Sequence, residues 1–326
     1  MTNRLTHGPI AALVLLGASG ASADPPPSPS AAPSPTSPAP TAFWPAELES
    51  TPLQPKPLYS SPFQLRGIFP KNAVRIDSVV GLYNAPAGNG QVTITFASAQ
   101  VRVTDWAALV VRWGFDTNDT VDESKLGFVN PTFGATIALP LGKEVRFAAS
   151  TAVGAPLASG GGNSPDASAL TMHRQAALAR SAMDNVAFAV NDVGFPTGVS
   201  FAYVGHGWTA QADATVIPSV RAKGAEAQSD TSKVNSTYGA FAGYALAREL
   251  SIGVELRYQR YLTTPAAVER DPSTRDNLTF ALGPRFSLQL GDSVWLRPAL
   301  SYARGLHGPV EQQSFQIVQL DLPLSF

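Results

Sequence analysis

Two-residue alternation of apolar and polar side chains recurs through residues 73–326. In the last such segment Val318, Leu320 and Leu322 share one parity, whereas Gln319 and Asp321 hold the other. Successive side chains of a strand point to opposite faces, so each segment has one apolar and one mostly polar face. The segments are about ten residues long, the length that a tilted strand needs to cross a bilayer. The sequence therefore predicts an all-β fold.

The connections between these segments are sorted by length. We expect about twelve strands, near residues 73–83, 91–103, 106–115, 127–139, 144–155, 197–204, 208–220, 236–246, 251–262, 277–290, 293–303 and 313–326. Odd-numbered connections are long, including 84–90, 116–126, 156–196 and 221–235, and even-numbered ones are tight. Short turns on one side and longer loops on the other predict a closed antiparallel transmembrane β-barrel. Pro284 and Pro298 fall inside expected strands, which requires bulges or earlier strand ends.

The chain ends on an apolar aromatic residue, Phe326, in an alternating strand. A soluble domain seldom ends this way, because terminal residues usually fray into water. This terminus resembles the C-terminal strand of Gram-negative outer-membrane β-barrel proteins, the class of porins and transporters. The resemblance implies a place in the cell outer membrane, contact with its lipid, and recognition of the last strand by the barrel-assembly machinery.

The N-terminal region divides into two parts before the barrel. Residues 1–23 have the basic start, short apolar core and small-residue cleavage site of a signal peptide. Residues 24–57 are rich in Pro, Ser and Ala and predict a disordered periplasmic linker. Residues 58–326 are assigned to the barrel, with 58–72 either leading into the first strand or lying across the barrel mouth.

Composition excludes several kinds of protein. The net charge of −1 argues against a nucleic-acid surface. The absence of Cys excludes disulfides and thiolate zinc sites. We expect neither a cofactor nor a metal. Clustered Asp and Glu in residues 116–123 could hold Ca²⁺, but their spacing is not that of an EF-hand, and a solvated acidic loop is the preferred interpretation.

Charged side chains on the inner face are the candidates for a channel lining. By parity these are Arg75, Asp77, Arg112, Arg146, Asp213, Glu255, Arg257, Arg285 and Arg297. Six arginines against three carboxylates give a positive lumen. Buried charges are costly unless they are paired or wet. They either form a sealing ionic network or line a polar channel that favours anions.

The third long connection, 156–196, is expected to contain a helix that extends to about Asn185. Ser164-Pro165 starts it as an N-cap followed by proline at the first helical position. This helix is either an external cap or an insert that narrows the lumen. In the second case His173, Arg174 or Arg180 would set the charge of the constriction.

These features together favour a passive channel for small polar solutes, with anions as candidates. The alternatives are a non-conducting barrel with a structural or surface-recognition role, and a secreted soluble β-protein that binds a ligand. An enzyme is not expected, because no His falls in a strand beside a Ser with a third group to orient it.

Overall fold

The computed structural model describes residues 59–326, with gaps at 86–87 and 228. The predicted signal peptide and linker lie outside the described residues. The described residues belong to one compact unit, Pro55–Phe326. Among them, no helix has both the length and the apolar character needed to cross a bilayer.

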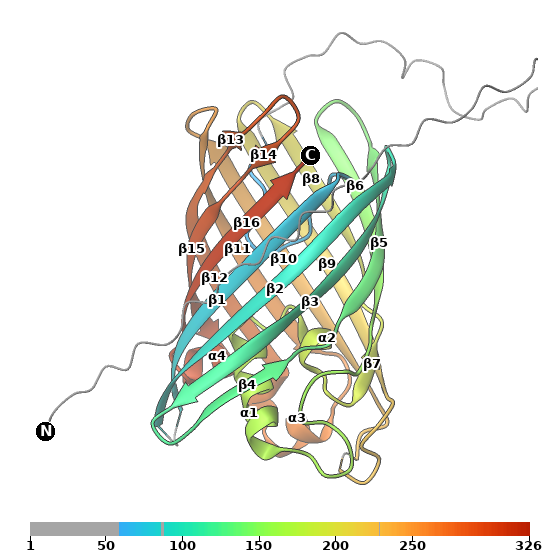
Figure 1. The fold of residues 1–326 in the computed structure, drawn as a ribbon, viewed down its shortest axis with the longest axis vertical. Coiled ribbons are helices and arrows are strands. Elements are labelled where there is room, and N and C mark those ends of the chain that lie inside the picture. Colours follow the sequence, from blue (N-terminus) through green and yellow to red (C-terminus); the bar gives the residue numbers. More distant parts are fainter. Residues whose placement is uncertain (1–58, 86–87, 228) are drawn as a thin grey trace, which may run out of the picture. The chain divides into compact units, whose positions relative to one another are not determined.

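The strands form one closed antiparallel ring (Figure 1). They are β1 Ala73–Ala85, β2 Gly88–Thr104, β3 Ala107–Thr120, β4 Ser124–Phe128, β5 Thr132–Pro140, β6 Val145–Gly154, β7 Asp192–Gly194, β8 Thr197–Gly205, β9 Trp208–Arg221, β10 Ser232–Ala245, β11 Leu250–Tyr261, β12 Asp276–Phe286, β13 Leu288–Gln289, β14 Trp295–Leu296, β15 Ala299–His307 and β16 Gln316–Ser325. β4 continues into β5, β7 into β8, β12 into β13 and β14 into β15. The ring therefore consists of twelve continuous strands. β1 pairs with β16 from Ala73 opposite Ser325 to Leu82 opposite Gln316, and this pairing closes the ring. The predicted twelve-stranded barrel is confirmed.

The outer face of the ring is apolar. Large side chains such as Leu109, Trp113 and Val254 are 56%, 51% and 42% exposed. Near one end of the barrel the rings of Trp208 and Tyr244 lie 4.7 Å apart on this face. These side chains face outward and are not stacked between two sheets. The alternative of a soluble β-protein with those faces in its core is therefore wrong.

The two ends of the barrel differ, as predicted. We call the end with the C-terminus and the tight connections the turn end, and the opposite end the loop end (Figure 1). Some loops at the loop end are shorter than expected, because strands continue as hairpins. β1 and β2 extend to Ala85 and Gly88, and β3 pairs with β4 as far as Asp119 opposite Ser124. Pairing satisfies backbone groups outside a bilayer as well as within it.

The two strand prolines have different outcomes. Pro284 lies inside β12, opposite Ile252 of β11. On its other side, β12 pairs with β15 at Leu282 and again at Arg285, so the ladder is interrupted around the proline. Pro298 separates β14 from β15, and its carbonyl accepts a 2.8 Å hydrogen bond from the nitrogen of Phe286. One strand therefore tolerates its proline and the other breaks at it.

The helices lie at the loop end (Figure 1). They are α1 Ala167–Ala179, α2 Asn185–Phe188, α3 Ala266–Arg270, the 3-10 helix Pro272–Arg275 and α4 Pro309–Gln312. Asp166 caps α1 by accepting a 3.2 Å hydrogen bond from the nitrogen of Ala169. The expected cap at Ser164 is therefore two residues early.

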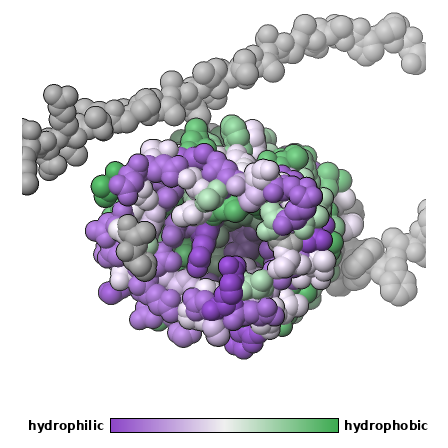
Figure 2. Space-filling view, turned by 90° about the horizontal axis from the view of Figure 1, so that it is seen from below, coloured by the Kyte–Doolittle hydropathy of each residue, from purple (hydrophilic) through white to green (hydrophobic). Residues whose placement is uncertain are grey.

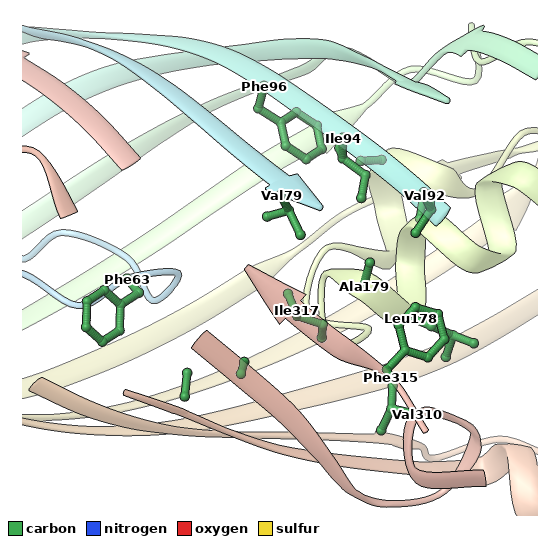
Figure 3. Packing of buried hydrophobic residues seen from close by; sticks show 14 of the residues in the cluster. Phe63, Val79, Val92, Ile94, Phe96, Leu178, Ala179, Val310, Phe315 and Ile317 are labelled. Atoms are coloured by element: carbon green, nitrogen blue, oxygen red, sulfur yellow. The ribbon is translucent and has the colours of Figure 1, made fainter. Parts of the chain in front are cut away.

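An apolar cluster fills part of the barrel interior (Figure 3). The inner faces of β1 and β2 contribute Val79, Val92, Ile94 and Phe96, all at most 1% exposed. The end of α1 packs against them. A Cβ built on Gly81 would lie 2.8 Å from the Cβ of Ala179, so glycine permits this close approach. This patch is an exception to the mostly polar inner face that the alternation predicts, because in residues 92–96 the apolar side chains point inward and the threonines point outward.

Candidate functional site

Residues 59–72, the N-terminal segment, lie inside the barrel without regular secondary structure. The carboxylate of Glu255 on β11 accepts hydrogen bonds from the nitrogens of Phe63 (2.7 Å) and Gln64 (3.2 Å). Asp213 on β9 accepts one from the nitrogen of Arg66 (3.2 Å). Figure 3 shows Phe63 on this coil within the ring. The inward carboxylates thus replace the strand partners that the segment lacks.

The carbonyls of the N-terminal segment are bound by donors from the barrel wall. Arg285 donates to the carbonyls of Ser61 (2.9 Å) and Pro62 (2.8 Å). Arg75 and Gln319 both donate to the carbonyl of Phe63, at 2.5 and 3.0 Å. Several of the charges predicted to line a channel therefore hold the backbone of this segment.

A second insert enters from the loop end. The guanidinium of Arg180, just after α1, is 1% exposed and contacts Asp77 of β1 at 2.7 Å and Asp184 at 2.8 Å. Arg112 of β3 contacts Asp184 at 2.8 Å. Burial alone would raise the pKa of Asp184, but the positive charges of Arg112 and Arg180 hold that pKa well below its usual range. The loop is thereby fixed to two strands by ion pairs.

The structure separates the three residues proposed for the cap or constriction. Arg180 reaches into the lumen, as an insert requires. Arg174 is exposed, and His173 is buried beside Asp116, where its Nδ1 lies 2.8 Å from a carboxylate oxygen. α1 packs against β1, β2, β3 and β4 at the loop end, and Arg180, the residue after it, extends to Asp77 of β1.

The remaining inward charges are paired or stacked. Arg257 contacts Glu255 at 2.6 Å, and Arg75 and Arg285 share Asp321 of β16 at 2.5 and 2.7 Å. Asp321 was absent from the predicted lining, although its parity placed it on the polar face.

Two further arginines lie over aromatic rings. The guanidinium of Arg146 is 5.0 Å from the centre of the Phe69 ring, and that of Arg297 is 5.5 Å from Trp295. Such stacking partly compensates for the loss of water around a guanidinium group.

A cavity of about 270 Å³ separates the N-terminal segment from the barrel wall. Its wall side carries small and hydroxyl-bearing residues, including Ser98, Gly134, Thr136 and Ser150. Four of the predicted lining residues border it, namely Arg75, Arg112, Asp213 and Arg285. Asp77, Arg146, Glu255, Arg257 and Arg297 do not border it.

The same cavity has two basic residues that the sequence analysis did not select, Arg66 and Lys71. Burial, and after it the positive charges of Arg297, Arg75 and Arg285, lower the pKa of Lys71 to about 8. Lys71 belongs to residues 58–72, which were expected either to lead into the first strand or to lie across the barrel mouth. Only the folding of that segment into the barrel brings it to the cavity.

A second pocket, of about 220 Å³, opens at the loop end. α1 and α2 form one side, and the inner faces of β9, β10 and β11 form the other. Figure 2 looks onto this end and shows a hollow surrounded by mostly hydrophilic residues, with hydrophobic residues along the sides of the barrel.

Two acidic side chains of residues 116–123 contact α1. Asp116 turns inward to His173, and Glu123 accepts a hydrogen bond from Ser168. Within residues 59–326, gaps excepted, no three His, Asp or Glu side chains converge as metal ligands. Nε2 of His173 faces the carbonyl of Ser159 at 3.1 Å, so this nitrogen is not directed at a serine hydroxyl.

Comparison with known proteins supports the fold. No protein-family model and no curated protein sequence matches the chain. Among solved structures, the COG4313 outer membrane channel from Pseudomonas putida F1 has a TM-score of 0.53 at 10% identity, covering 82% of this chain and 100% of the channel. The KdgM and NanC porins match at TM-scores of 0.42 and 0.44, with 9% and 7% identity; each match covers 77% of this chain, and 99% and 98% of the porins. The closed ring with its apolar exterior has the architecture of outer-membrane β-barrel proteins, and the similarity to the COG4313 channel supports this fold.

Proposed function

We propose that the barrel is a narrow passive channel for small polar solutes and that it prefers anions. The observation that carries this proposal is the cavity between the N-terminal segment and the wall of the barrel. Hydroxyl groups and small side chains line its wall side, so the cavity suits water and polar solutes. The loop end then faces outward and the turn end faces the periplasm, as in other outer-membrane barrels.

The charges of the cavity support the preference for anions. Five cationic side chains border it, Arg66, Lys71, Arg75, Arg112 and Arg285, against three carboxylates, Asp184, Asp213 and Asp321. Within the part of the chain that the structure describes, Lys71 and Arg66 have no carboxylate within ion-pair distance. A surplus of fixed positive charge raises the local concentration of anions.

The way in which the N-terminal segment is held would allow it to leave the lumen and open the channel. Hydrogen bonds and side-chain contacts retain it, and no strand of the ring pairs with it. Its departure would therefore leave the β1–β16 closure intact. The cavity and the space vacated by the segment would then form a wider path.

Conductance of the refolded protein in a planar bilayer tests the proposal. We expect small single-channel currents and, in a salt gradient, a reversal potential on the anion-selective side. Removal of residues 160–185 should increase the current, because it removes α1 and the ion pairs of Arg180. A protein that remains silent after this deletion, while still correctly folded, would contradict the channel.

A non-conducting structural barrel is the second candidate, and one observation favours it. The two inserts meet inside the barrel, where the side chain of Gln64 donates to the carbonyl of Arg180 at 2.7 Å and to Asp184 at 3.3 Å. This contact joins the N-terminal segment to the third loop. Silence of the wild-type protein and of the deletion variant would support this candidate.

A further inference from the structure

The pocket at the loop end is lined by several polar and basic side chains. It is bordered by Arg174 and Lys233, by the amides of Asn185 and Asn235, and by the ring of Tyr261. No Asp or Glu is among its lining residues. Asp192 contacts Lys233 at 2.6 Å and neutralises it, whereas Arg174 is exposed and has no ion-pair partner within the described ranges. The pocket is therefore rich in hydrogen-bond donors, and Arg174 at its edge has a charged neighbour, Asp271, but no direct salt bridge.

Asn235 provides an independent sign of a missing ligand. Its side chain is 3% exposed, and its Nδ2 has no hydrogen-bond partner. The other polar atom of this amide, Oδ1, lies 2.7 Å from Nε2 of Gln259. A buried polar atom without a partner costs about 1–3 kcal/mol, so such atoms are rare unless something else binds them.

We propose that this pocket binds a small hydroxylated carboxylate. The carboxylate would pair with Arg174, and the hydroxyl groups would complete the amides of Asn235 and Asn185, since a hydroxyl both donates and accepts. The rings of Tyr261 and Phe188 offer apolar surface to the carbon skeleton. The volume of about 220 Å³ is below the roughly 300–1,000 Å³ of pockets for drug-sized ligands, which limits the ligand to about one sugar ring.

This inference deepens the proposed function, because a site at the loop end would hold an anion before it reaches the lumen. It does not depend on passage through the barrel, however. Binding is measured on the refolded protein in detergent, with no current involved. Absence of binding would therefore leave the channel proposal untouched, and absence of conductance would leave the binding proposal untouched.

Isothermal titration of the full chain with D-glucuronate and with D-glucose is the test. The two sugars share a ring and differ in the carboxylate. We expect D-glucuronate to bind and D-glucose to bind at least about tenfold more weakly, the loss expected for one charge-assisted contact. Equal affinity for the two sugars, or no binding of D-glucuronate at millimolar concentrations, overturns the proposal.

Three variants assign the binding to the pocket. Arg174→Gln, at an exposed position, and the near-isosteric Asn235→Asp should each weaken D-glucuronate binding about tenfold. Arg270→Gln is the matched control, because Arg270 is exposed on α3 at the same end and does not border the pocket. Unchanged binding in Arg174→Gln, or an equal loss in Arg270→Gln, overturns the assignment.

Discussion

The carboxylate of Glu255 accepts a 2.7 Å hydrogen bond from the backbone nitrogen of Phe63, 192 positions earlier in the chain. Glu255 is also in contact with Arg257, at 2.6 Å, and both side chains are 1% exposed or less. One acidic residue on β11 therefore both neutralises a buried arginine and retains the N-terminal segment.

Removal of this charge pair should loosen the N-terminal segment. In Glu255→Gln/Arg257→Met neither member is left as an unpaired buried charge, so the ring should remain folded. We expect faster proteolysis within residues 59–72 and more frequent channel opening than in the wild type. Limited proteolysis and bilayer recording measure the two effects. A segment as protected as in the wild type would show that Glu255 does not retain it.

Two inward arginines should respond differently to the same substitution. Arg112 borders the cavity, and Arg112→Gln should shift the reversal potential toward lower anion preference. Arg257 does not border it and is buried beside Glu255, so Arg257→Gln should instead destabilise the barrel by about 3–5 kcal/mol. Urea unfolding in lipid vesicles gives the second value. A selectivity change in Arg257→Gln equal to that in Arg112→Gln would count against the cavity as the route.

The lowered pKa of Lys71 predicts that the anion selectivity of the channel depends on pH. Its pKa of about 8 means that it is charged at neutral pH and loses its proton as the pH rises through that value, far below its ordinary 10.5. Anion preference should therefore decrease from about pH 7 to pH 9. Lys71→Arg keeps its charge and should abolish this decrease, whereas Lys71→Gln should show the lower preference at every pH. An equal decrease in all three proteins would assign the effect to another group.

The same pKa predicts a change in stability. Between about pH 8 and 10.5 the unfolded chain retains a proton on Lys71 that the folded protein has lost. The contribution of Lys71 to the free energy of unfolding should therefore rise with pH across this window. Unfolding titrations of the wild type and of Lys71→Gln at both limits measure the difference.

Gly81 tests whether α1 must approach the wall closely. A side chain there would meet Ala179, Val92 and Phe315 at 2.8–3.2 Å, so Gly81→Val should cost about 1–3 kcal/mol and displace the helix. We expect faster cleavage within residues 156–196 and an intact barrel. Gly142→Val is the control, because a Cβ on Gly142 has nothing within 4 Å. Equal cleavage in the two variants would mean that this contact does not position α1.

The sequence predicted the strands of the barrel far better than the segments and ion pairs that fill its lumen. Alternation is a local property, so the outward face of residues such as Leu109 and the inward face of Arg75 could both be inferred from parity. The occupant of the lumen could not, because residues 59–72 carry no periodicity and bind side chains far away in the chain. The pairing of Arg75 with Asp321 likewise joins positions 246 apart, and only ring closure brings them together.

The contact between Gln64 and the third loop has a thermodynamic consequence. Since the N-terminal segment and the third loop touch, the free energy of docking one of them depends on whether the other is docked. A molecule that prefers the docked third loop must also strengthen retention of the N-terminal segment, by the same factor with which the segment strengthens its binding. The two openings of this barrel are thus subject to reciprocal linkage, although they lie on opposite sides of the membrane.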